Sequence, residues 1–192
     1  MSRIGKKPVS IPQGVKVEQQ GRNIKMAGPK GTLELACHPD ISVRVDTAAN
    51  QIVVENPDPQ NRRKRALHGT TRALLHNMAT GVFEGFSKEM QIFGTGYNVK
   101  EQDGKLLLQV GFASPAELPI PKAVKVDIKA AATKGNETPA VFVLLSLDKY
   151  QLGQFAANVR RVRPPEPYLG KGIRYAGEHI VRKEGKAFAS GS

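Results

Sequence analysis

The stretch from Arg160 to Tyr175 carries the side chains of this sequence best suited to hold a polyanion. It reads R-R-V-R-P-P-E-P-Y-L-G-K-G-I-R-Y, which joins three clustered arginines, three prolines and a lysine between two glycines. Clustered guanidinium groups raise the local positive potential, prolines fix backbone torsions, and glycines let main-chain amides approach a ligand closely. The pattern favours a phosphate-binding surface. The alternative interpretation is a solvated charged tail that follows a proline helix stop.

A second basic cluster, Arg62-Arg63-Lys64-Arg65, opens a predicted helix. Four cations at a helix N-terminus oppose the macrodipole there, at a cost of roughly a few tenths of a kcal/mol per charge. Bound phosphates would offset this cost, and so would solvent and counterions, so both interpretations of the cluster stay open. Helix-turn-helix, zinc-finger and basic-zipper signatures do not occur in the sequence.

Patterns typical of enzymes and metal sites are poor in this sequence. Gly94-Thr95-Gly96 starts like a dinucleotide-binding fingerprint, but Val99 occupies the third glycine position and a strand is predicted to follow. The four histidines show no metal-ligand spacing, and no pair of carboxylates is spaced to share a helix face with a histidine. We therefore expect no catalytic residues, no metal, no cofactor and no small-molecule substrate.

Composition and charge narrow the class of protein. The chain has 192 residues, of which 40% are hydrophobic, so it is long enough to build a folded core. A net charge of +12 indicates a polyanionic partner, either nucleic acid or an anionic membrane. The longest strongly apolar run, Val141 to Leu145, is far shorter than the roughly 20 residues of a spanning helix, which argues against the membrane. Cys37 is the single cysteine and no secretion signal opens the chain, so we expect a reducing, cytoplasmic setting.

The excess positive charge is confined to particular segments. Residues 1–82 hold 13 basic and 6 acidic side chains, residues 83–159 hold 8 of each, and residues 160–192 hold 8 basic and 3 acidic side chains. Solubility alone would be served by scattered charge, so this segregation indicates a binding edge.

The chain runs twice through a similar pattern, which predicts an internal repeat. In the first half, apolar alternation predicts strands, followed by a helix over about 62–79. The second half repeats this order and ends with a helix over 149 to about 162. The strands are expected over 15–17, 24–26, 32–36, 41–45 and 52–54, and again over 89–93, 96–99, 106–110, 124–128 and 141–145.

Glycines mark the turns and helix ends of this pattern. Gly28-Pro29-Lys30-Gly31 and Asp103-Gly104 predict hairpin turns, because glycine adopts positive φ without a Cβ penalty. Gly81 is expected to end the first helix as a left-handed cap. The sequence therefore predicts an α+β fold of two tandem similar domains, each a mostly antiparallel β-sheet with one packed α-helix, over residues 1–82 and 83–192.

Four segments together resemble a known family. They are S-R-I-G-K-K-P-V-S-I-P at the start, the turn G-P-K-G-T-L, the helix start R-R-K-R-A-L-H-G-T-T-R-A-L, and P-E-P-Y-L-G-K-G-I-R-Y. They look like bacterial-type large-subunit ribosomal protein six, the L-six family, and the resemblance spans essentially the whole chain. Its most specific part is Pro165 to Ile173, where the family commonly reads P-E-P-Y-K-G-K-G-I. Leu169 replaces the first lysine of that motif, which removes one expected phosphate contact.

The resemblance implies partners as well as a fold. It implies two similar α+β domains produced by a duplication, without catalytic activity. It implies binding to large-subunit rRNA, chiefly in its 3′ domain near the sarcin-ricin loop and the base of the factor-binding stalk, beside neighbouring large-subunit proteins. Placed on this sequence, the family's C-terminal motif implies rRNA contacts at Tyr168, Gly170, Lys171, Gly172 and Arg174, flanked by Arg160, Arg161 and Arg163.

RNA structure indicates how these residues would act. A folded RNA helix hides its base edges in a deep, narrow groove, so recognition by shape, phosphate and 2′-hydroxyl contacts is expected. Tyr168 or Tyr175 would either stack on an exposed base or sugar, or brace the proline bend as a buried side chain, and both interpretations stay open. The basic cluster of the first helix adds Arg62, Arg63 and Lys64 to the expected rRNA-binding residues.

These observations lead to one expected function and one alternative. We expect a non-enzymatic, rRNA-binding structural constituent of the large ribosomal subunit in the cytoplasm, which supports subunit assembly and translation. The alternative is a free RNA-binding regulator or RNA chaperone that acts outside the ribosome. A stable, stoichiometric place in the large subunit would exclude this alternative as the main role.

Overall fold

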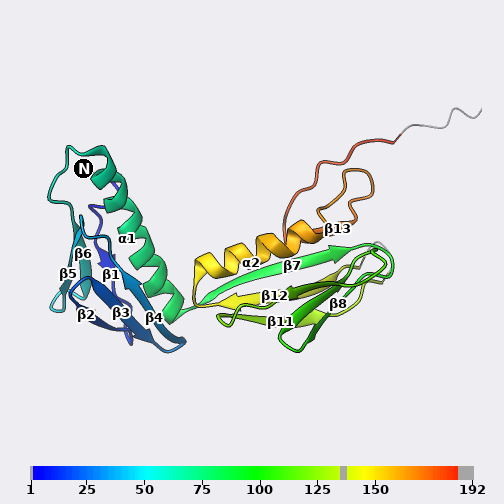
Figure 1. The fold of residues 1–192 in the computed structure, drawn as a ribbon, viewed down its shortest axis with the longest axis horizontal. Helices are drawn as coiled ribbons and strands as arrows, with labels where there is room; N and C mark the ends of the chain where they lie inside the picture. The colour runs from blue at the N-terminus through cyan, green and yellow to red at the C-terminus, as the bar shows by residue number, and fades with distance from the viewer. Residues whose placement is uncertain (1, 135–137, 186–192) are drawn as a thin grey trace, which may run out of the picture. The chain divides into compact units, whose positions relative to one another are not determined.

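Two α-helices and short strands make up the described part of the chain, residues 2–134 and 138–185 of a computed structural model (Figure 1). The expected α+β class is confirmed. The chain divides into two units, of which the first comprises residues up to 86 together with 146–149, and the second comprises the rest. The predicted domain boundary after residue 82 stays a prediction, because a division into compact units does not show where a repeated sequence unit begins.

The strands of the first unit form two antiparallel sheets. They are β1 (Val9–Ser10), β2 (Lys16–Gln20), β3 (Asn23–Gly28), β4 (Gly31–Ala36), β5 (Ser42–Asp46) and β6 (Gln51–Glu55). The order is β1–β6–β5 in one sheet and β2–β3–β4 in the other. Gly28 lies opposite Gly31, so the predicted hairpin turn between β3 and β4 is confirmed.

The helix of the first unit, α1 (Arg62–Phe83), packs against β1, β3, β4 and β6. It starts where the sequence predicts and continues to Phe83. Its buried face includes Leu75, Met78 and Val82, and these side chains join Ile24 and Ile52 from the strands in one hydrophobic core. Burial of this apolar stripe is what holds the helix on the sheets.

Gly81 does not end α1, so the prediction of a left-handed cap at this residue is wrong. Gly81 is buried within the helix, and a Cβ atom there would collide with the carbonyl oxygen of Leu147. A Cβ atom on Gly31 would lie 2.6 Å from the Leu147 side chain. The left-handed residue that follows the helix is Gly85, with φ +78°. Glycine is therefore required at position 81 by the close approach of the Leu147 backbone.

The second unit holds one four-stranded and one three-stranded sheet. Its strands are β7 (Phe86–Phe93), β8 (Asn98–Gln102), β9 (Lys105–Gln109), β10 (Ala116–Pro119), β11 (Val124–Ala130), β12 (Ala140–Ser146) and β13 (Gly172–Tyr175). The order is β11–β12–β7–β13 in the larger sheet and β10–β9–β8 in the smaller. Asp103 and Gly104 both have positive φ, 51° and 69°, as a tight hairpin turn requires, so the turn predicted there is confirmed.

The helix of the second unit, α2 (Lys149–Val162), lies along β7 and β12 (Figure 1). Met90 and Ile92 of β7 and Ile173 of β13 are fully buried, as alternation along paired strands requires. The buried face of α2 is an apolar stripe that consists of Leu152, Phe155, Ala156 and Val159.

Three strands, β1, β10 and β13, are not predicted by the sequence pattern. They span only two to four residues, which is too short for alternation to be seen. β13 is nevertheless a full partner of β7, from Gly172 opposite Phe93 to Tyr175 opposite Met90. Within the described residues, no helix is long and apolar enough to cross a membrane.

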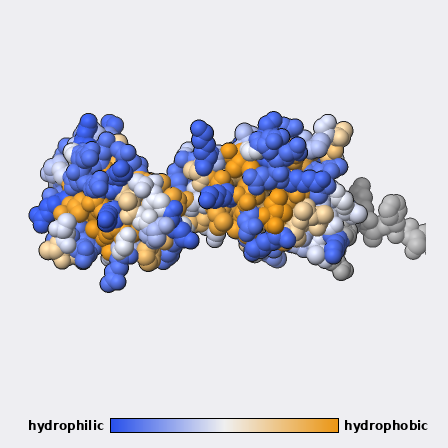
Figure 2. Space-filling model, turned by 90° about the horizontal axis from the view of Figure 1, so that it is seen from below, coloured by the Kyte–Doolittle hydropathy of each residue, from blue (hydrophilic) through white to orange (hydrophobic). Residues whose placement is uncertain are grey.

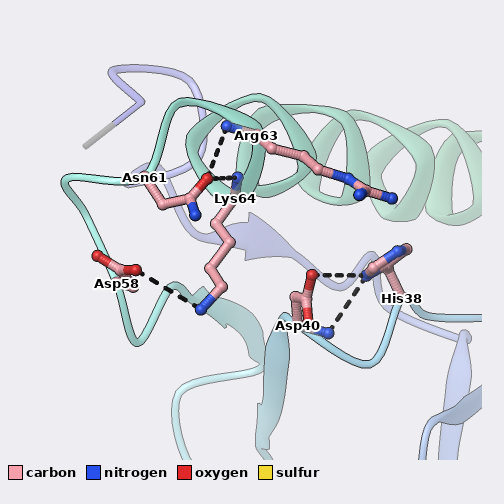
Figure 3. A network of polar contacts seen from close by, with 6 residues as sticks. All are labelled: His38, Asp40, Asp58, Asn61, Arg63 and Lys64. Carbon is pink, nitrogen blue, oxygen red and sulfur yellow. Dashed lines mark hydrogen bonds and ion pairs between the residues drawn. The ribbon is translucent and has the colours of Figure 1, made fainter.

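Asn61 caps the N-terminus of α1 (Figure 3). Its backbone is extended, and its side-chain oxygen accepts hydrogen bonds from the amides of Arg63 (2.9 Å) and Lys64 (3.2 Å). The first turn of the helix contains no acidic side chain that would balance the cations there. The cap is therefore the main local support for a helix start that carries unfavourable charge.

We predict that Asn61→Ala lowers the free energy of unfolding of the first unit by about 1 kcal/mol, because two helix amides lose their acceptor. Asn61→Asp should raise it, since a carboxylate keeps the cap and adds negative charge beside the cations, and added salt should weaken this gain. Urea unfolding followed by circular dichroism measures both effects.

Asn77→Ala, within α1, is the matched control, because it removes the same side chain without removing a cap and improves helix propensity. Equal unfolding midpoints for Asn61→Ala and the unsubstituted protein would contradict the role given to the cap.

Candidate nucleic-acid interface

The basic stretch that follows α2 is a closed loop and not a free tail. Ile173 donates a backbone hydrogen bond to the carbonyl of Arg163 (2.8 Å), and Glu166 donates one to the carbonyl of Lys171 (2.9 Å). The chain then continues into β13, which pairs with β7 and forms the edge of the four-stranded sheet. The interpretation as a solvated tail is therefore wrong for residues 163–175. We call residues 163–172 the basic loop.

Gly172 is the point at which the basic loop closes on itself. It has φ +132°, and a Cβ atom there would lie 2.6 Å from the carbonyl oxygen of Pro164 and 2.8 Å from Cα of Pro165. Gly170 also has positive φ, +73°. Both glycines thus have a structural reason to be glycine, while their expected contact with a ligand stays a prediction.

The two tyrosines of this region differ in exposure. Tyr168 is 55% exposed, and its neighbour Leu169 is 62% exposed. Tyr175 is half-buried, with the ammonium group of Lys88 4.3 Å from its ring centroid. The exposure of Tyr168 suits the stacking interpretation, whereas the ring of Tyr175 is in contact with Lys88 of β7.

The predicted basic residues around the loop are available to solvent to different degrees. Arg161 is exposed, whereas Arg163, Lys171 and Arg174 are half-buried. The loop and the strand after it thus bring these four cations, from three consecutive parts of the chain, to one edge of the second unit.

Arg160 has a partner within the protein. Its guanidinium group donates two hydrogen bonds to the carboxylate of Glu178, one of them from Nε to Oε2 at 3.1 Å. The backbone amide of Tyr175 donates to the same carboxylate at 3.0 Å. The hydrogen bonds from Arg160 lower the pKa of Glu178 below its ordinary value, and those to Glu178 raise the pKa of Arg160. The pair fixes the end of α2 to the turn after β13.

Arg174 lies over an aromatic ring. Its guanidinium carbon is 3.7 Å from the centroid of Phe93, which belongs to the paired strand β7. Burial lowers the pKa of Arg174, and the charge of Arg182 lowers it further. The arginine is thus held in place by packing while its charge is partly uncompensated.

Sequence reasoning missed two cations that border the basic loop. Arg182 approaches Gly170, where a Cβ atom would lie 3.3 Å from Nη2. Lys183 donates its backbone amide to the carbonyl of Pro167 at 2.8 Å. Both belong to the basic excess of residues 160–192 that charge counting identifies, but their position beside the loop follows only from the folded chain.

Arg163 meets an aromatic ring from another loop. Its guanidinium carbon lies 5.4 Å from the ring centroid of Phe112, which is 45% exposed. Phe112 stands between β9 and β10 and was not among the predicted site residues. The candidate interface therefore extends beyond the basic loop.

The basic cluster of the first unit is also exposed. Arg62, Arg63 and Arg65 are exposed at the start of α1, and Lys64 forms an ion pair with Asp58 at 3.6 Å. In Figure 3 the Arg63 side chain extends away from Lys64 and Asp58. The structure thus leaves three arginines of this cluster displayed toward solvent.

A metal centre has no support in the described parts of the chain. Among residues 2–134 and 138–185, no group of three or more His, Cys, Asp or Glu side chains is placed to hold a metal ion. Cys37 is buried, and burial raises the pKa of its thiol, which keeps the sulfur protonated and unreactive.

Comparison with known proteins identifies the family. The family model for ribosomal protein L6 matches this chain over residues 11–85 and 93–176, one match in each half. A protein of Listeria welshimeri called large ribosomal subunit protein uL6 is 45% identical over 186 residues, which cover 97% of this chain and 98% of that protein. The protein of the same name from Caldicellulosiruptor saccharolyticus is 44% identical over 191 residues, covering 100% and 99%. This chain, with its two similar α+β units and its P-E-P-Y-L-G-K-G-I loop, belongs to the ribosomal protein L6 family.

Proposed function

We propose that the protein is a non-catalytic, structural constituent of the large ribosomal subunit that binds rRNA through the edge of its second unit. The observation that carries the proposal is the basic loop, closed by backbone hydrogen bonds and bordered by exposed cations. The names of its relatives, large ribosomal subunit protein uL6, support a place in the large subunit. A rigid loop suits RNA, because recognition of a folded RNA depends on matching its shape and phosphate spacing.

Within this proposal the residues have different tasks. Arg161, Arg163, Lys171 and Arg174 contact phosphates, and exposed Tyr168 stacks on a base or sugar. Arg160, whose guanidinium is hydrogen-bonded to Glu178, acts mainly by positioning the loop. Gly170 and Gly172 set the path of the backbone, and Arg62, Arg63 and Lys64 form a second RNA contact in the first unit.

The place in the subunit and its partners form the finer part of the proposal. We infer that the rRNA site lies in the 3′ domain, near the sarcin-ricin loop and the stalk base, and that binding supports assembly and translation; the family resemblance supports this placement. Neighbouring large-subunit proteins are the other partners. Figure 2 shows a continuous apolar area on the viewed face of the second unit, and exposed apolar surface of this kind favours protein contacts.

We predict that the protein sediments with the large subunit on a sucrose gradient and stays there through a moderate-salt wash, because many phosphate contacts break only when salt competes for all of them. Immunoblotting of the fractions gives the result. A peak at the top of the gradient would instead support a free RNA-binding regulator or chaperone.

We predict that Arg161→Ala and Lys171→Ala each weaken binding to large-subunit rRNA and flatten its salt dependence. The slope of log affinity against log salt should fall by roughly 0.7 to 0.9 for each lost phosphate contact. Filter binding over a salt series measures this. Lys125→Ala, on an exposed position of β11, removes the same charge away from the loop and should leave the slope unchanged; equal slopes in all variants would move the interface elsewhere.

We predict that Glu178→Gln lowers rRNA affinity on the order of tenfold, since loss of charged hydrogen bonds worth about 1.5 kcal/mol releases Arg160 and the turn after β13. Electrostatics alone gives the opposite sign, because the substitution removes a negative charge near RNA. Glu184→Gln, at an exposed position, is the charge-matched control and should bind as well as or better than the unsubstituted protein. Tighter binding by Glu178→Gln would contradict the positioning role.

The same pair gives a pH dependence of fixed sign. Because the folded-state pKa of Glu178 is lowered, its contribution to stability is complete above the ordinary glutamate pKa of about 4.3 and is lost as the pH falls through the lowered value. The free energy of unfolding of the second unit should therefore fall between neutral and acid pH. Part of this fall should be absent in the Glu178→Gln variant, and urea unfolding at a series of pH values measures the difference.

A further inference from the structure

Phe112 is an exposed aromatic residue on a loop that the fold holds rigidly. It follows Gly111, which has φ +83°, and a Cβ atom on Gly111 would lie 2.9 Å from the hydroxyl oxygen of Tyr97. The ring of Tyr97 also touches Gly94, where a Cβ atom would lie 2.5 Å away. Tyr97 is only 9% exposed, and its ring packs against the backbone at both Gly94 and Gly111.

Hydrogen bonds from Thr133 join the segment of Gly94 and Tyr97 to another part of the second unit. The hydroxyl group of Thr133 donates to the carbonyl of Gly94 at 2.6 Å, and its amide donates to the carbonyl of Tyr97 at 3.0 Å. Thr133 thus holds the segment of Tyr97, and the Tyr97 ring in turn packs against Gly111, the residue before Phe112. Phe112 is therefore exposed beside a backbone position, Gly111, that packs against a buried side chain.

Arg163 reaches Phe112 from an equally fixed position. Its carbonyl accepts the hydrogen bond from Ile173, and its guanidinium carbon lies 5.4 Å from the Phe112 centroid. Two loops distant in sequence thus bring a cation of the proposed RNA contact beside Phe112, a residue that is 45% exposed.

This pairing fits one ligand chemistry. Proteins that recognise folded RNA bind unpaired nucleotides by stacking the base on an aromatic side chain, while a nearby arginine contacts the phosphate. Every base offers a π-face, so such a site needs no base-edge hydrogen bonds. A purely paired RNA helix would not use the ring, because its bases are already stacked.

We propose that Phe112 and Arg163 form a binding site for one unpaired nucleotide of the RNA, with the base on the Phe112 ring and a phosphate on Arg163. The inference rests on the proposed function, because it takes the basic loop as an RNA contact. It adds a non-electrostatic contact from a segment that has no basic residue between β9 and β10.

The test measures the affinity of full-length variants for in vitro transcribed large-subunit rRNA over a salt series. The variants separate the contributions of the Phe112 ring, of its apolar volume and of the Arg163 charge. Phe112→Ala should weaken binding about 5- to 100-fold without changing the salt slope, because stacking releases no counterions. Phe112→Leu keeps apolar bulk but has no π-face and should lose nearly as much, whereas Phe112→Tyr should bind like the unsubstituted protein. Arg163→Ala should weaken binding and also flatten the slope.

Chemical probing of the RNA supplies a second measurement. At least one unpaired nucleotide should be protected by the unsubstituted protein and by Phe112→Tyr, and become reactive with Phe112→Ala. Circular dichroism and unfolding midpoints equal to those of the unsubstituted protein show that each variant is folded.

Two outcomes overturn the inference while the proposed function stands. If Phe112→Ala binds rRNA as tightly as the unsubstituted protein, the ring makes no contact with RNA. If Phe112→Leu retains full affinity while Phe112→Ala does not, an apolar side chain of this size is sufficient. The residue then contributes apolar packing and not base stacking. If the unsubstituted protein fails to bind large-subunit rRNA at all, it is the proposed function that fails.

Discussion

The pairing of the edge strand β13 with β7 is the constraint on which the candidate interface depends. Without it, the residues after α2 would be a mobile basic peptide, and ordering them on RNA would cost roughly 1 kcal/mol or more per residue. The pairing requires the chain to reverse within a few residues, which is possible because Gly172 crosses directly over Pro164. The conformational entropy of the loop is therefore lost during folding, and binding to RNA does not have to order it.

Charge in this region is organised by specific internal contacts. Arg160 is neutralised by Glu178, whereas Arg174 is stacked on Phe93 and experiences the charge of Arg182. Stacking on an aromatic ring restrains an arginine without cancelling its charge. The edge of the second unit thus combines restrained side chains with positive potential that Glu178 cancels only in part, and a phosphate backbone can balance the remainder.

Local chemistry made much of the fold predictable. The α+β class, the two helices and the hairpin turn at Asp103-Gly104 follow from periodicity and turn residues, which act within a few positions along the chain. β13 and the true role of Gly81 were not predictable, because each depends on a segment far away in sequence. Arg160 was identified as basic, but its partner Glu178 lies 18 residues further on and only the fold brings them together. The position of Phe112 beside Arg163 has the same origin.

The four residues 146–149 belong to the first unit although they lie far along the chain from its other residues. Leu147 occupies the space above Gly31 and Gly81, so the packing of the first unit is complete only when this segment is present. A ribosome makes the chain from its N-terminus, and the first unit therefore waits for most of the second to be synthesised before its last contacts form. A fragment cut after α1 would lack those contacts, however well its own strands and helix are formed.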